Sequence, residues 1–283
     1  LHVKPGPIRH AGELRYRVME VDDRLSMVQM EVAGAALAGS LQTFVRPPPR
    51  SQQSYAEVRR SSPPAAYAGQ RALVIGGSRG LGEAAAKLVA AGGGEVMITY
   101  RVGEQDARAV QRDISAGGGR CHLVQLDTDR MAEGLARVAA AGFAPTHIYY
   151  FPTPSLSRTV GASFDENLFA RYARVYVSAF AELHRFAGRQ WRGRLDYFYP
   201  STVATREYSP DLLEYACAKA AGEQLCRQLA GRESVSRIVV ANLPLIATDL
   251  TLSLLPSAAA DAIEVMRPIV QDVQLGGPAG AQS

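Results

Sequence analysis

The stretch Arg71-Ala-Leu-Val-Ile-Gly-Gly-Ser-Arg-Gly-Leu-Gly82 decides the fold of this chain. It reads as an apolar strand, a turn with the spacing Gly-x-x-x-Gly-x-Gly, and the start of an Ala-rich helix that continues to Ala91. In such a unit Gly76 permits a tight turn, Gly80 lets the backbone approach a pyrophosphate, and Gly82 allows close helix–strand packing. The helix N-terminus then points N–H groups at the anion. The predicted cofactor contacts of this turn are Gly76, Ser78, Arg79, Gly80, Leu81 and Gly82.

Strand-like and helix-like segments alternate from this stretch onward. Strand patterns occur at 95–100, 121–126, 146–151, 195–199 and 236–241, and helical patterns at 107–116, 131–141, 165–188 and 213–229. Strands that alternate with helices of this length indicate βαβ units and a parallel sheet. The predicted class is therefore α/β, with a doubly wound parallel sheet over residues 69–283.

Residues 1–46 have a different pattern. Polar and apolar residues alternate over 15–21, 27–32 and 40–45, which predicts a small N-terminal antiparallel β appendage of three strands. Three strands are marginal alone, so we expect them to pack on the main domain, a partner chain or an upstream part. Pro and Ser dominate 47–68, which we interpret as a linker.

Composition excludes several function classes. Hydrophobic residues make up 47% and charged residues 20% of the chain, an ordinary globular mixture. The net charge of +4 is spread over scattered arginines, so we expect no nucleic-acid partner. No apolar run is long enough for a membrane span, and the five histidines lack metal-ligand spacing. Three cysteines do not make a disulfide framework and favour a cytoplasmic location.

The end of the second predicted strand bears on the type of nicotinamide cofactor. Sites for NAD usually place an acid there, whereas this strand ends Thr99-Tyr100-Arg101. Arg101 and Arg79 could together clamp a 2′-phosphate, which favours NADPH. Asp127 ends the third strand and could accept a hydrogen bond from the adenine amino group, with Thr128 beside it. The alternative for Asp127 is a helix N-cap.

The segment Tyr215-Ala-Cys-Ala-Lys219 suggests the chemistry. A spacing of four places Tyr215 and Lys219 on one helical face, where an ammonium would lower the pKa of the phenol. Tyr215 could then donate a proton to a carbonyl oxygen. Lys219 could also bind the nicotinamide ribose. Thr202 lies 13 residues before Tyr215, at the end of the fifth strand, and could hold the substrate oxygen. Ser201 is the alternative one residue away.

Residues 70–250 resemble the short-chain dehydrogenase/reductase superfamily. The glycine turn is similar to the family's Thr-Gly-x-x-x-Gly-x-Gly, and Thr202, Tyr215 and Lys219 match its Ser-(x)12-Tyr-x-x-x-Lys. The segment from Asn242 to Thr248 resembles the family's Asn…Pro-Gly…Thr. The resemblance implies a Rossmann-type sheet, NADPH-dependent reduction of a ketone, and contact between Thr248 and the nicotinamide carboxamide.

The chain also departs from the family pattern. Tyr149-Tyr-Phe-Pro-Thr-Pro154 replaces Asn-Asn-Ala-Gly, and Tyr176 occupies the place of the Asn that props a proton-relay water. Pro244-Leu245 replaces Pro-Gly, and the usual last strand is absent from the pattern. The altered motif after the fourth strand and Tyr176 support an alternative function, that of a degenerate Rossmann domain acting as a scaffold in a multidomain synthase.

The N-terminal segment that ends Phe44-Val-Arg-Pro47 resembles the last strands of hotdog-fold acyl dehydratases. That resemblance implies a 3-oxoacyl thioester as substrate, either small or bound to a carrier protein, in fatty-acid or polyketide-type biosynthesis. It also implies an upstream hotdog domain or a homo-oligomer as a partner for the appendage.

Overall fold

The computed structural model describes residues 2–4, 14–34, 38–45, 52–156, 163–207, 210–231, 236–246 and 259–275. The chain divides into two compact units. The first comprises Leu1–Pro49 with Leu252–Ser257, and the second comprises Arg50–Thr251 with Ala258–Ser283.

The first unit contains an antiparallel sheet in the order β1-β4-β3-β2. Its strands are β1 (His2–Lys4), β2 (Leu14–Asp22), β3 (Met27–Gly34) and β4 (Ala38–Phe44). The predicted three-strand meander is confirmed as β2–β4, and β1 adds a fourth strand that the alternation did not predict. The resemblance to hotdog dehydratases stays a prediction.

One face of this sheet is apolar. Residues directly opposite in antiparallel strands share a face, and the register pairs Tyr16 with Val32 and Val18 with Met30. A register shift between Val18 and Glu20 inserts one residue, which returns Val21 to the same face. The Tyr16 side chain on this face is 71% exposed.

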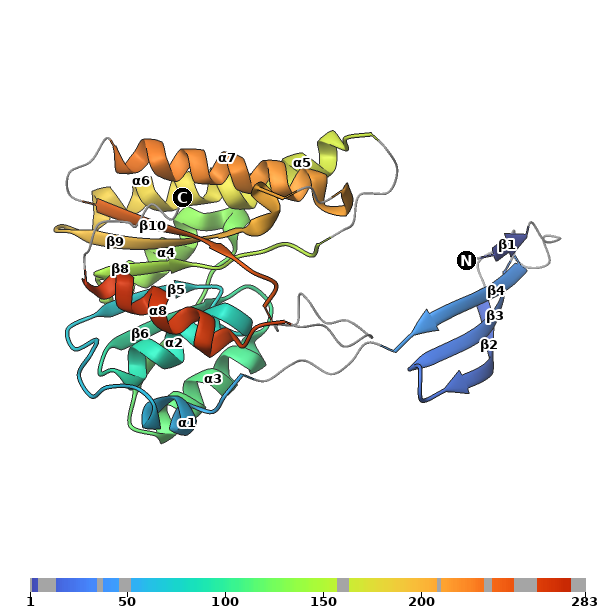
Figure 1. Ribbon diagram of the computed structural model, residues 1–283, viewed down its shortest axis with the longest axis horizontal. Helices are drawn as coiled ribbons and strands as arrows, with labels where there is room; N and C mark the ends of the chain where they lie inside the picture. Colours follow the sequence, from blue (N-terminus) through green and yellow to red (C-terminus); the bar gives the residue numbers. More distant parts are fainter. Residues whose placement is uncertain are drawn as a thin grey trace. The chain divides into compact units, whose positions relative to one another are not determined.

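The second unit contains a six-stranded parallel sheet in the order β10-β9-β8-β5-β6-β7, which confirms the predicted doubly wound fold (Figure 1). The strands are β5 (Arg71–Ile75), β6 (Glu95–Tyr100), β7 (Arg120–Gln125), β8 (His147–Tyr150), β9 (Leu195–Thr202) and β10 (Ser236–Leu243). The α-helices are α1 (Tyr55–Arg60), α2 (Gly80–Ala91), α3 (Glu104–Ala116), α4 (Met131–Ala140), α5 (Glu166–Ala173), α6 (Phe180–Gln190), α7 (Leu213–Ala230) and α8 (Ala262–Leu275). The short helical segments of the described residues are η1 (Thr128–Arg130), η2 (Arg174–Ala179), η3 (Val203–Thr205) and η4 (Pro210–Leu212).

Helices cover both faces of this sheet, and each face has its own core (Figure 1). Successive residues of β5 point to opposite faces, so Ala72 and Val74 join the core that includes α2 and α8. Leu73 and Ile75 join the core that includes α4 and α6. Because both faces are buried, the strand is continuously apolar, which is why the sequence pattern showed it so clearly.

The predicted linker over 47–68 is helical in part. Ser54 and Glu57 form a capping box that begins α1, and Tyr55 and Val58 are buried in the same core as α2. The Tyr55 hydroxyl donates to the Ala90 carbonyl at 3.2 Å. The main body therefore includes residues before the expected boundary at Gly69. The prediction of a linker relied on the Pro and Ser content and overlooked the capping box and the helical spacing of Tyr55 and Val58.

The predicted long helix over 165–188 is interrupted. The π-helical segment η2 separates α5 from α6. Within it, the carbonyls of Val175 and Tyr176 accept hydrogen bonds from the hydroxyls of Tyr150 at 2.7 Å and Tyr199 at 3.0 Å. Carbonyls that bond to neighbouring strands in this way locally disturb the regular helical ladder, and π-bulges are frequent at functional sites.

The C-terminal part of the described chain is helical. Among the described residues no strand follows β10, and α8 contacts α2 instead. None of the described helices is long and apolar enough to cross a membrane.

Candidate active site

The glycine turn lies at the carboxyl end of β5. Gly76 has a φ of +79°, and the backbone of Phe151 and Pro152, which follow β8, comes within 3.3 Å of where a Gly76 Cβ would be. A Cβ on Gly82 would lie 2.2 Å from the Gly76 carbonyl oxygen, so no larger residue fits there. The turn is fixed to β6 by the Gly77 N–H, which donates to the Thr99 carbonyl at 3.0 Å.

The first turn of α2 fits a phosphate. Helix α2 begins at Gly80, and no side chain at its N-cap, Arg79, bonds to its first N–H groups. Such N–H groups need acceptors from elsewhere, and the helix dipole favours an anion there. Ser78 lies in the same turn, and Leu81 packs partly against the core behind it. The predicted cofactor contacts of this turn therefore lie together, in a turn that packs closely against the first turn of α2 because Gly82 has no side chain.

Of the two arginines predicted to bind the 2′-phosphate, Arg79 already has an ion-pair partner in the protein. Arg79 forms an ion pair with Asp106 at 3.3 Å, and both side chains are nearly half exposed. Arg101 is exposed, and its carbonyl accepts from Gln125 at 3.0 Å. Sequence reasoning found no acid at the end of the second strand and so missed Asp106. Its position in the first turn of α3, close behind that strand, was the available signal.

The adenine contact predicted for Asp127 has a local competitor. The Asp127 carboxylate accepts from the Asp129 N–H at 3.1 Å and caps η1, which is the alternative that the sequence left open. Thr128 begins η1, and its carbonyl accepts from Arg174 at 3.1 Å. Thr248 lies outside the described residues.

Tyr215 and Thr202 meet at the carboxyl end of β9. Thr202 ends that strand, and Tyr215 lies in the first turns of α7. The Thr202 hydroxyl lies near the phenol and acts to lower the pKa of Tyr215, but burial outweighs it and raises that pKa to about 12. The expectation that Lys219 lowers the pKa of Tyr215 is therefore wrong for the chain alone, because desolvation of the phenolate dominates.

Lys219 is buried one helical turn after Tyr215. Its Nζ donates to the Pro200 carbonyl at 2.8 Å, and only 4% of the residue is exposed. Burial lowers the pKa of Lys219 to about 7, while nearby Cys226 and Glu223 act to raise it. The helix thus places the two residues as predicted, with the ammonium held at the end of β9.

The structure distinguishes Ser201 from Thr202. The Ser201 hydroxyl is buried and donates to the carboxylate of Glu223, which also accepts from Thr205 at 3.0 Å. Thr202 is thus the hydroxyl that faces Tyr215. Sequence reasoning missed Glu223, although Tyr215, Lys219 and Glu223 recur at a spacing of four and share one face of α7.

Two further tyrosines surround Tyr215. The rings of Tyr172 and Tyr176 both meet the Tyr215 ring edge-on, with centroids 5.8 Å and 5.7 Å away. Tyr176 is fully buried, and Thr153 faces its hydroxyl without forming a well-aligned hydrogen bond. The expected departure at Tyr176 thus lies directly beside the predicted catalytic residues.

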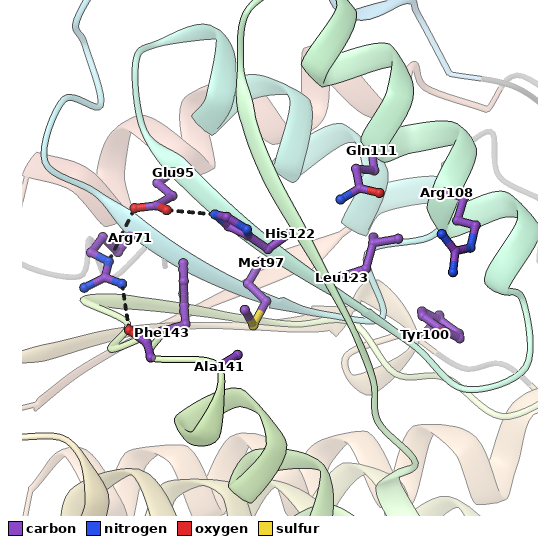
Figure 2. Close-up of a pocket in the computed structure, with 11 residues that line it drawn as sticks. Arg71, Glu95, Met97, Tyr100, Arg108, Gln111, His122, Leu123, Ala141 and Phe143 are labelled. Carbon is purple, nitrogen blue, oxygen red and sulfur yellow. Dashed lines mark hydrogen bonds and ion pairs between the residues drawn. The ribbon is translucent and has the colours of Figure 1, made fainter.

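A separate hollow of about 540 Å³ lies at the other edge of the sheet (Figure 2). Its lining comes from β5–β7, α3 and the segment after α4, and includes the linked side chains of Arg71, Glu95 and His122. None of its lining residues belongs to β9 or α7. The hollow is therefore distinct from the Tyr215 site. No group of His, Cys, Asp and Glu among the described residues could hold a metal.

Comparisons with known proteins agree with this fold. No family model matches the chain. Over 73 residues, 26% of the chain, it is 37% identical to an uncharacterized oxidoreductase of Methylorubrum extorquens and covers 29% of that protein. The chain spans less than a third of the length of the curated relatives it matches.

Solved structures match far more of the chain. A short-chain dehydrogenase from Burkholderia cenocepacia, in complex with NADP, has a TM-score of 0.63 and 26% identity over 77% of this chain and 94% of its own. LugOII, a promiscuous reductase that catalyses keto-reduction in lugdunomycin biosynthesis, has a TM-score of 0.62 and 19% identity over 72% of this chain and 90% of its own. The chain therefore has the fold of the short-chain dehydrogenases/reductases, the superfamily that its motifs resemble.

Proposed function

We propose that this protein is an NADPH-dependent oxidoreductase that reduces a ketone. One observation carries the proposal: the Tyr215 hydroxyl faces the Thr202 hydroxyl, with Lys219 buried one turn away and bonded to the end of β9. A phenol, a second hydroxyl and an ammonium at the carboxyl edge of a doubly wound sheet are groups suited to proton donation at a carbonyl.

Each residue has a distinct part in this proposal. Tyr215 donates its hydroxyl proton to the carbonyl oxygen, and Thr202 holds that oxygen and the phenol in line. A protonated Lys219 stabilises the phenolate that remains. Glu223 fixes Ser201 and Thr205 and so positions the end of β9 that carries Thr202.

The glycine turn is the proposed cofactor site. When bound, the reduced nicotinamide supplies the hydride. Gly76 and Gly82 permit the tight turn and its close packing on α2, Gly80 would let the backbone approach the pyrophosphate, and the N–H groups of α2 would hold it. Arg79 and Arg101 would hold the 2′-phosphate. The NADP complex of the Burkholderia cenocepacia dehydrogenase, which has the same fold, supports this cofactor.

The substrate proposal is a 3-oxoacyl thioester, either small or presented by a carrier protein. The keto-reduction named for LugOII supports a ketone as the group reduced. The scaffold alternative also rests on an observation, because Tyr176 fills space beside Tyr215 and Lys219 with a buried aromatic ring.

A cofactor titration followed by turnover tests the proposal. NADPH should bind at least ~10-fold more tightly than NADH, about 1.4 kcal/mol, and Arg101→Ala should reduce that ratio. A panel of oxoacyl thioesters should then give turnover. Equal affinities would refute the assignment to Arg79 and Arg101, and NADPH binding with no turnover across the panel would favour the scaffold.

A further inference from the structure

The Lys219 ammonium lies in an aromatic enclosure. Its Nζ is 4.0 Å from the centroid of the Tyr176 ring, 5.3 Å from that of Tyr199 and 6.0 Å from that of Tyr215. Two of these rings belong to other elements, η2 and β9. A cation within about 6 Å of a ring centroid is attracted by the negative face of the ring.

This enclosure offsets an otherwise unfavourable burial. A lysine that is 4% exposed loses most of its hydration, which disfavours its charged form. Among the described residues its one hydrogen bond is to the Pro200 carbonyl, although an ammonium has three donors. The face of a nearby ring compensates in part for the missing water, and Tyr176 supplies the shortest such contact.

We propose that Tyr176 is a positioning residue whose ring face holds the Lys219 ammonium against the Pro200 carbonyl and keeps it charged beside Tyr215. The inference rests on the proposed role of Lys219 in reduction. It concerns the ring and not the hydroxyl, since that hydroxyl is buried and has no hydrogen-bond partner among the described residues. Tyr176 then does more than fill space, because it supports the protonation state that the reaction needs.

The other groups near Lys219 either raise its pKa or contact it without changing its charge. On its own helix, Glu223 and Cys226 raise its pKa, and Tyr215 offers a third ring. From β9 come the Pro200 carbonyl and the Tyr199 ring, whose hydroxyl donates to the Tyr176 carbonyl at 3.0 Å. Weakening the Tyr176 ring as a cation acceptor should therefore lower the pKa of Lys219 with these groups unchanged.

The test varies the ring electronically at nearly constant volume. Phenylalanine and then increasingly fluorinated phenylalanines would be placed at position 176, since fluorine withdraws charge from the ring face. The chain has three lysines, Lys4, Lys87 and Lys219, so ¹³Cε-lysine labelling gives three NMR signals to titrate. Loss of a signal in Lys219→Arg assigns it.

Tyr176→Phe should leave the pKa of Lys219 unchanged, and full fluorination should lower it by about one unit. The matched control is the same series at Phe198, whose ring lies in the core on the opposite face of β9 from Tyr199. A Lys219 pKa that does not respond to fluorination at position 176, or that responds equally at position 198, overturns the proposal. The measurement needs no turnover, so it remains decisive even if the chain reduces none of the tested ketones.

Discussion

Separate removal of the adjacent hydroxyls of Ser201 and Thr202 should separate stability from catalysis. Ser201 is buried and donates to the Glu223 carboxylate, and a hydrogen bond to a charged group contributes about 1.5–3 kcal/mol. Ser201→Ala should therefore lower the free energy of unfolding by about that amount. In a domain of this size each kcal/mol lowers Tm by roughly 2–4 °C. Turnover should fall less than about 10-fold, because Thr205 still holds Glu223 at 3.0 Å.

Thr202→Val should show the reverse. Its hydroxyl accepts only one long hydrogen bond from the backbone, from the Ala204 N–H at 3.3 Å, so the stability loss should be about 1 kcal/mol. The same hydroxyl faces Tyr215, and losing a donor at the reacting oxygen costs roughly 10²–10³ in kcat. Urea unfolding and steady-state kinetics with NADPH measure both effects. A larger loss of kcat in Ser201→Ala than in Thr202→Val would refute this assignment.

Three further predictions concern the turn, the cofactor and pH. Gly82→Ala places a Cβ 2.2 Å from the Gly76 carbonyl oxygen, so it should weaken NADPH binding at least ~10-fold and lower stability by about 1–3 kcal/mol. Gly188→Ala, whose Cβ would have nothing within 4 Å, should change neither quantity. Equal NADPH affinity in the two variants would contradict the turn geometry. Asp106→Asn removes the carboxylate that pairs with Arg79, so it should raise the ratio of NADPH affinity to NADH affinity. An unchanged or lower ratio would show that Asp106 does not compete with the 2′-phosphate for Arg79. Burial lowers the pKa of His147 to about 4. Between pH 6.5 and 4, His147 is therefore protonated in the unfolded chain and neutral in the folded chain. The free energy of unfolding should therefore decrease as the pH is lowered across that window, by at most about 1.4 kcal/mol per pH unit. In chemical denaturation, His147→Gln should make the free energy of unfolding less dependent on pH. An unchanged dependence would mean that His147 is not the responsible group.

The sequence predicts most of the fold because the buried elements have strong patterns. β5 is apolar on both faces and leads directly into glycines whose spacing indicates a tight turn packed against a helix. The interruption at η2 could not be predicted, since it involves hydroxyls of Tyr150 and Tyr199 from distant strands. Helix α1 was missed because six residues give little periodicity and prolines lie on either side.

The candidate site shows the same division. The spacing of Thr202, Tyr215 and Lys219 is local to one strand–helix unit, and the structure brings these residues together. The Arg79–Asp106 pair and the bonding of Ser201 to Glu223 depend on tertiary proximity between elements, which spacing does not encode. The direction of the Tyr215 pKa also depends on burial, which the sequence alone does not give.

The central claim is that Tyr215 is the proton donor, and Tyr215→Phe tests it most directly. The change keeps the ring, so the edge-on contacts with Tyr172 and Tyr176 should survive, and NADPH should bind as in the unchanged protein. Single-turnover reduction of an oxoacyl thioester that the unchanged protein reduces should slow by ~10²–10⁴-fold, the range expected for loss of a general acid. Reduction at the original rate, with NADPH bound, would contradict the account.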